Sequence, residues 1–156
     1  MSKFMFKNFE MTRYFFFREM NGLTEEMANV QPAGFNNNIR WHVGHVLTVT
    51  EQFMFGFPKK SQHLPENYPQ LFGNGTKPAD WTGEVPTLDE LKSHLENQLE
   101  RLKIVPEESL DQELKQPFRG LKTFGELANM ALYHEAHHMG QIHAMKRIVE
   151  TAAVKN

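Results

Sequence analysis

The sequence predicts an all-α protein, a four-helix bundle with a long connection between its second and third helices. Four segments carry apolar residues at three- and four-residue spacings, the repeat of an amphipathic helix. No segment shows convincing strand alternation, although region 113–122 could hold a short extended piece. We therefore treat residues 1–156 as a single domain, which is long enough to bury a hydrophobic core.

The first two helices are indicated by apolar spacing and by the residues at their ends. Phe6, Phe9 and Met20 belong to a repeat that predicts a helix over about 5–20 or beyond, broken by the segment 30–35. The asparagines at 36–38 offer N-cap side chains for a second helix, which should end near 56–58.

The segment 58–86 separates the second helix from the third. It contains five prolines and several glycines and shows no sustained period. A connection of this length without elements of its own is unusual in a small domain and is often a functional lid or rim.

The last two helices each begin with a capping box, in which Thr and Glu side chains satisfy free amides at a helix start. Thr87 and Glu90 open the third helix, which carries a leucine stripe and ends at Pro106. Thr123 and Glu126 open the last helix, which should continue to about Val149.

Composition limits the partners and the chemistry. The formal net charge is −2 and no basic stripe is present, so we expect neither nucleic-acid nor membrane binding. The chain contains no cysteine, so any metal site must use His, Asp or Glu. Without a signal-peptide pattern, we expect a cytoplasmic protein.

The best indication of function is a histidine-rich stretch near the C-terminus. His134 and His138 are four residues apart, so on a helix they project from one face and can offer two nitrogens to a transition metal. His45 shares its face of the second helix with Trp41 and Val49, so it should point into the bundle. Three convergent imidazoles would leave ligand positions open for water or substrate.

The other histidines are weaker candidates. His137 could replace His138 at i+3 from His134, but it turns away and is better placed at the rim. We expect His42 and His143 at the surface, and His63 and His94 show no partner pattern.

Other interpretations of these patterns remain open. Residues His134, Glu135 and His138 formally match the zinc-protease pattern His-Glu-x-x-His, but an all-helical chain argues against a protease. Glu51 should be a solvated or inter-helix charge. A plain structural bundle with hydrogen-bonded core histidines is the simplest alternative.

The combined motifs resemble the DinB-like family of helical bundle proteins. The likeness lies in Asn38-x-x-Trp41-His42-x-Gly44-His45 and in His134-x-x-x-His138-x-Gly140-Gln141-Ile142, together with the start of the last helix at 123–127. The resemblance implies a metal held by His45, His134 and His138, and a bundle that often dimerises.

The resemblance also implies a broad type of activity. Similar proteins include S-transferases and isomerases that use low-molecular-weight thiols, so we expect a metal-dependent, thiol-dependent S-transferase or a related hydrolase acting on a small molecule. Three imidazoles suit a divalent transition metal such as Zn, Ni or Fe. The alternative is a non-enzymatic protein that binds a metal or a small ligand. A homodimer is the expected assembly.

Overall fold

The computed structural model describes residues 1–57 and 61–154, and most of this chain is helical. The expectation of a mainly α-helical protein is thus confirmed, with about 66% of the residues in helices. The long helices are α1 (Lys3–Met20), α3 (Ile39–Glu51), α5 (Leu88–Lys103) and α6 (Phe124–Val154). Two short helices accompany them, α2 (Glu25–Asn29) and α4 (Tyr68–Phe72).

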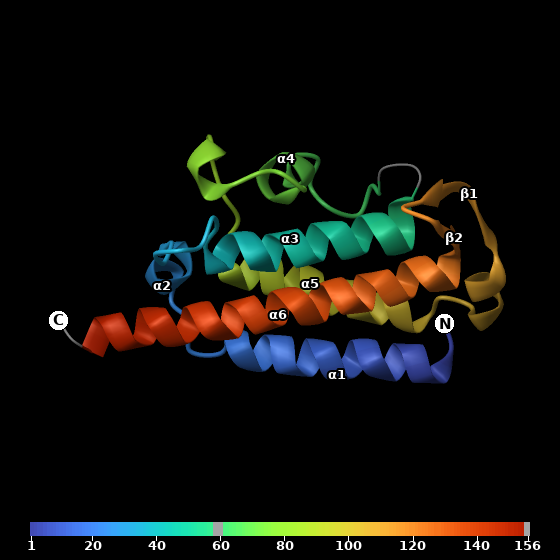
Figure 1. Ribbon diagram of the computed structural model, residues 1–156, viewed down its shortest axis with the longest axis horizontal. Helices are drawn as coiled ribbons and strands as arrows, with labels where there is room; N and C mark the ends of the chain where they lie inside the picture. Colours follow the sequence, from blue (N-terminus) through green and yellow to red (C-terminus); the bar gives the residue numbers. More distant parts are fainter. Residues whose placement is uncertain (58–60, 155–156) are drawn as a thin grey trace.

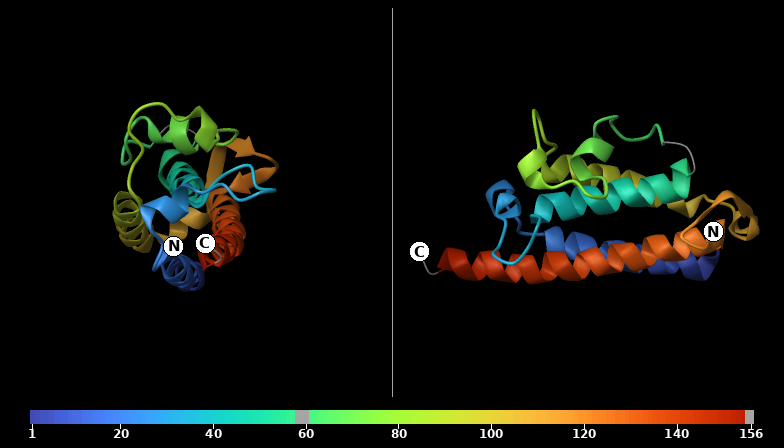
Figure 2. Two further views of the ribbon diagram at one scale, coloured as in Figure 1. Left: turned by 90° about the vertical axis from the view of Figure 1, so that its left-hand side faces the viewer. Right: turned by 45° about the horizontal axis from the view of Figure 1, so that its top comes forward.

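The four long helices lie side by side (Figures 1 and 2). Helices α1 and α3 each contact both α5 and α6. Helices α1 and α6 run in one direction, and α3 and α5 run in the other (Figure 1). Because α3 and α5 are parallel, the chain between them must return along the length of α3, which explains the long connection.

The helix starts agree with the predicted caps. The Asn38 side chain accepts a hydrogen bond from the Trp41 N–H at 2.8 Å, and Thr87 and Glu90 form both bonds of the capping box. The helix ends differ in detail. Helix α1 ends at Met20, Thr24 caps the separate helix α2, and α6 extends to Val154, beyond the predicted end at Val149.

The connection between α3 and α5 is more ordered than its sequence indicated. The prediction of a segment without elements of its own is wrong, because it contains α4 and the 3-10 turn η2 (Pro78–Asp80); Pro58, where the predicted connection begins, lies outside the described residues. Helix α4 packs against α3 on the side away from α1 (Figure 1). Gly44 permits this approach, since a Cβ there would lie 2.4 Å from the Phe72 ring.

A two-stranded antiparallel hairpin lies at the end of the molecule where α3 ends and α6 begins (Figure 1). It consists of β1 (Glu113–Phe118) and β2 (Leu121–Thr123), which confirms the short extended piece expected in this region. The 3-10 turn η3 (Glu107–Asp111) precedes it, and a π-helical turn, η1 (Gln52–Gly56), continues α3.

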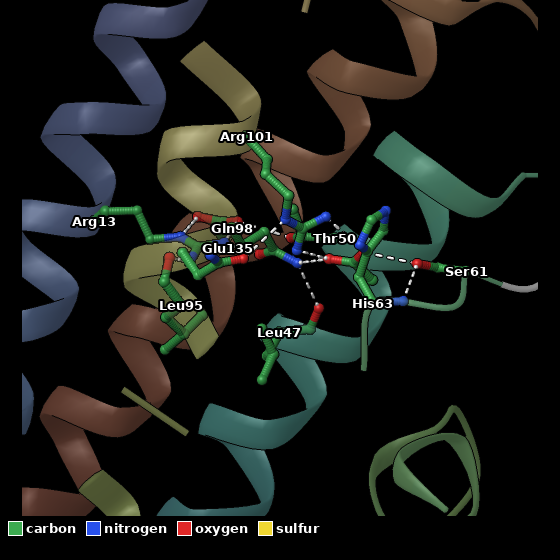
Figure 3. A network of polar contacts seen from close by, with 11 residues as sticks. Arg13, Leu47, Thr50, Ser61, His63, Leu95, Gln98, Arg101 and Glu135 are labelled. Carbon is green, nitrogen blue, oxygen red and sulfur yellow. Dashed lines mark hydrogen bonds and ion pairs between the residues drawn. The ribbon is translucent and has the colours of Figure 1, made fainter. Parts of the chain in front are cut away.

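The apolar core consists of two clusters. A buried polar layer lies between them, and Figure 3 shows its network of polar contacts. Each long helix contributes to this layer, between residues of the two clusters, through Arg13, Glu51, Gln98 and Glu135. Because a buried charge needs a partner, these side chains bond to one another, as in the ion pair of Arg13 with Glu135 at 2.6 Å. The layer therefore links all four helices at one level.

Glu51 is part of this layer and is not a solvated charge. It accepts hydrogen bonds from Arg101 at 2.7 Å and from Gln98 at 2.7 Å, both on α5. Burial alone would raise the pKa of Glu51, but the hydrogen bonds from Arg101, Gln98 and Ser61 together hold that pKa below its ordinary value. Of the two roles expected for Glu51, the inter-helix charge is the correct one.

None of the described helices is both long and apolar enough to cross a membrane.

Candidate metal centre

His45 is held in one orientation by groups on both sides of its ring. Its Nδ1–H donates to the Phe72 carbonyl oxygen at 2.6 Å, and the Trp41 ring stacks on it at a centroid distance of 4.3 Å. Because a carbonyl oxygen can only accept, the proton of the neutral ring lies on Nδ1. The lone pair of His45 is therefore on Nε2, and that atom is free to bind a cation.

The Nε2 atom of His45 faces the two histidines of α6. It lies 3.1 Å from Nε2 of His134, and the rings of His134 and His138 are 4.4 Å apart. One ring nitrogen from each of the three residues falls within 4.8 Å of the others. The structure thus brings together the three histidines that helical geometry selected, as a group that could bind a metal ion.

Burial keeps this group neutral. Burial and the neighbouring His45 ring lower the pKa of His134 to about 3, and burial with the His134 ring lowers the pKa of His138 to about 2. For His45, burial lowers the pKa, although the bond to the Phe72 carbonyl acts in the opposite direction. Since a metal binds only unprotonated imidazole, the rings are ready to act as ligands at neutral pH.

The hydrogen bonds of His45 and His134 also leave a ring nitrogen lone pair that a cation could bind. If His134 donates its Nε2 proton to His45, its own Nδ1 remains an acceptor, and this buried atom has no partner among the described residues. If Nδ1 carries the proton instead, two Nε2 lone pairs face each other at 3.1 Å, which a cation would stabilise. Two nitrogens bound to one ion at ~2.1 Å in tetrahedral geometry are ~3.4 Å apart, so a pair separated by 4.8 Å would close by ~1.4 Å.

His42 corrects the sequence-based expectation. We expected it at the surface, but it is buried, and its Nδ1 lies 2.8 Å from Nδ1 of His138. Burial and the nearby His45 ring lower the pKa of His42 to about 4. With His138 donating from Nδ1, His42 orients that ring and leaves His138 Nε2 for a metal. The i, i+3 spacing of His42 and His45 is the sequence signal that could have indicated this role.

The remaining histidines lie outside the cluster. His137 and His143 are exposed, as expected, and bond to Gln141 and Glu19 respectively. His63 is exposed, and the His94 ring packs edge-on against Tyr68 at 5.6 Å. None of these four belongs to the group of ring nitrogens that could share an ion in the described part of the chain.

Glu135 does not serve the site in the manner of a zinc protease. Its carboxylate is fully buried and receives hydrogen bonds from Arg13 at 2.6 and 2.8 Å and from Thr50 at 2.7 Å. A general base must reach a substrate or its water, whereas this carboxylate is enclosed in the polar layer. The match of 134–138 to the protease pattern is therefore coincidental.

Two neighbouring cavities lie beside the cluster. The histidine cavity, of about 480 Å³, is lined by His45 and His134 together with mainly apolar side chains, among them Val49, Phe53 and Met130. The polar cavity, of about 560 Å³, is lined by polar side chains such as Glu51, Ser61 and Gln70. Both cavities share Thr48, Gln52 and Pro69, so they adjoin each other.

The fold and the site define a mainly helical protein with a three-histidine group suited to a metal ion. The chain belongs to the DinB superfamily, whose family model matches residues 8–142. The same fold occurs in a conserved protein from Enterococcus faecalis of known crystal structure, with a TM-score of 0.69, 16% sequence identity, and coverage of 97% of this chain and 98% of that chain. No curated protein matches this sequence.

Proposed function

We propose that this protein is a metal-dependent enzyme that transfers a low-molecular-weight thiol to an electrophilic small molecule, or catalyses a related hydrolysis. His45, His134 and His138 would hold a divalent transition metal, Zn, Ni or Fe. The observation that supports the proposal is the convergence of three buried, neutral imidazoles beside a cavity of substrate size. We also propose that the four long helices, α1, α3, α5 and α6, form the expected four-helix bundle. Their contacts with one another support this.

The metal would supply Lewis acidity, which lowers the pKa of a bound thiol and favours the thiolate near neutral pH. The protein's own groups fix the geometry. The Phe72 carbonyl and the Trp41 ring orient His45, while His42 orients His138. In the transfer, a carbon–sulfur bond forms as the leaving group departs with its electron pair, and the thiol proton passes to solvent.

The pair of adjoining cavities supports a reaction with two substrates. The electrophile would occupy the mainly apolar histidine cavity, and the polar body of the thiol would occupy the polar cavity. Thr48 lines both cavities, and its buried Oγ1 has no hydrogen-bond partner among the described residues. A buried hydroxyl without a partner is costly, so it is a natural contact for a substrate at the junction.

The metal site is tested by elemental analysis and by zinc titration of the purified protein. We expect one metal per chain in the wild type and a large loss of metal in His138→Ala. The matched control is His143→Ala, because His143 lies on the same helix but is exposed and outside the cluster. Stoichiometric metal that persists unchanged in His138→Ala would refute the ligand assignment.

The reaction is tested separately with zinc-loaded, nickel-loaded and chelated protein. Cysteine and glutathione serve as thiols, and 1-chloro-2,4-dinitrobenzene serves as a generic electrophile whose product is followed by absorbance. Turnover that requires the metal and is lost in His45→Ala supports the enzyme. If the protein binds metal but shows no turnover with either thiol, the alternative of a non-enzymatic metal- or ligand-binding protein would be favoured.

We further propose a homodimer located in the cytoplasm. Dimerisation is supported by exposed apolar side chains on α1, namely Phe4, Met11 and Tyr14, of which Phe4 is 86% exposed. The proposed cytoplasmic location agrees with the absence of cysteine from the sequence, because the chain can form no disulfide. Sedimentation that shows only monomer at micromolar concentrations would contradict the dimer.

A further inference from the structure

The turn of the β-hairpin carries an arginine in an unfavourable backbone conformation. Phe118 pairs with Leu121, so the turn consists of Arg119 and Gly120, with φ angles of 50° and 88°. Two central residues with positive φ define a type I′ turn, which favours Asn or Asp followed by Gly. Gly120 meets this preference, whereas Arg119 does not. Of the non-glycine residues that the structure describes, Arg119 alone has a positive φ.

Arg119 is exposed and belongs to the lining of the histidine cavity. It lines that cavity together with Phe118, His45 and His134. Arg119 is the only Arg, Lys, Asp or Glu among the described residues that line it. No described carboxylate lies within ion-pair distance of Arg119, so its charge is not neutralised by the protein itself.

The guanidinium rests on a fixed aromatic base. Its carbon lies 5.6 Å from the centroid of the Phe118 ring, within the range of a cation–π contact. The Phe118 ring in turn packs edge-on against Phe53 at 5.1 Å and Phe57 at 5.7 Å. An arginine supported in this way loses less conformational freedom when it binds an anion, and its planar group can pair with a carboxylate through two hydrogen bonds.

We propose that the histidine cavity binds a small organic anion with an apolar body, and that Arg119 determines this specificity by pairing with its carboxylate. The body would lie on Phe53, Phe118 and Met130, with its other end directed towards His45 and His134. This inference rests on the proposed function, in which the cavity receives the electrophile. It predicts that electrophiles with a carboxylate on an aromatic or aliphatic body bind more tightly than uncharged electrophiles of the same shape.

A carboxylate could also bind a metal directly, so the test must isolate the contribution of Arg119. Two ligands with the same apolar body, 4-phenylbutyrate and the uncharged 4-phenylbutanol, are titrated into the zinc-loaded and the metal-free protein by calorimetry. Arg119→Asn removes the cation and places a favoured residue in the turn, so the variant should be at least as stable as the wild type. Lys122→Asn, in the same hairpin but outside the cavity, has the same change in net charge and serves as the control.

We expect Arg119→Asn to weaken binding of 4-phenylbutyrate by about tenfold or more, in both the zinc-loaded and the metal-free protein, because a charged hydrogen-bonded pair is lost. Binding of 4-phenylbutanol, and all binding to Lys122→Asn, should change little. Equal weakening of both ligands in Arg119→Asn would indicate a merely structural role and would overturn the proposal. So would the absence of measurable 4-phenylbutyrate binding to the wild type. A protein that fails to bind zinc but shows the Arg119 effect would refute the proposed function and leave the anion site standing.

Discussion

Lowering the pH from 7 to 5 in a chelating buffer is a direct perturbation of the histidine cluster. His42, His134 and His138 have pKa values of about 4, 3 and 2 in the folded protein, all below the ordinary value of 6.5. Below pH 6.5 the unfolded chain therefore binds protons that the folded chain does not. Stability must fall as the pH falls, and the loss begins near pH 6.5 and is complete only below the folded pKa values.

The size of the effect follows from the same pKa values. A histidine that stays neutral in the folded protein costs about 2 kcal/mol of stability between pH 7 and pH 5. For three such rings the loss of stability is about 6 kcal/mol. If one ring of the cluster accepts a proton in the folded protein, the loss is about 4 kcal/mol. Either value is a large part of the ~5–15 kcal/mol that stabilises an ordinary domain.

Urea unfolding at pH 7, 6 and 5, followed by circular dichroism, measures this loss. His42→Phe should reduce the loss by about 2 kcal/mol, because one buried titrating ring is removed. His63→Gln replaces an exposed histidine outside the cluster and should leave the loss unchanged. A loss below about 2 kcal/mol in the wild type would mean that the rings accept protons in the folded protein, which would refute the argument from burial.

Four further outcomes test how the site is built. Zinc affinity measured by competition with a chromophoric chelator should change little between pH 7 and pH 5.5, because the ligands are already unprotonated in the folded protein. In the same assay, His42→Phe should weaken zinc binding about 10–100-fold through loss of its contact with His138. Glu135→Gln should cost about 3 kcal/mol in urea unfolding by leaving a buried arginine charge. Gly44→Ala should lower the melting temperature by forcing the Phe72 ring away, at a cost of about 1–3 kcal/mol.

The sequence could predict features that depend on local geometry. Helical spacing and capping side chains located the long helices, and the i, i+4 relation placed His134 and His138 on one face. The apolar neighbours of His45 placed it on an inward face. These predictions succeed because each depends on residues within one or two turns of the same helix.

Features that depend on distant partners were not predictable in this way. Helix α3 is buried on nearly all sides because α4 covers it, and the connection that contains α4 has no periodic pattern. His42 was expected in solvent, but it is buried where its ring meets His138 of α6. The burial of Glu51 likewise depends on Arg101 and Gln98, about 50 residues away. No local pattern encodes which helix supplies such a partner.

The polar layer and the proposed metal ligands are neighbours on α6, which links the stability of the fold to the geometry of the site. Glu135 lies between His134 and His138 in sequence, and its carboxylate is bonded to Arg13 on α1 and Thr50 on α3. These bonds fix the rotation and the height of α6 relative to α3, and hence the approach of both histidines to His45. Since His45 is oriented separately by Phe72, the three rings are positioned by the protein before any ion binds. A site positioned in this way would not need metal for folding, in contrast to a zinc finger, which agrees with the reactive role proposed for the ion.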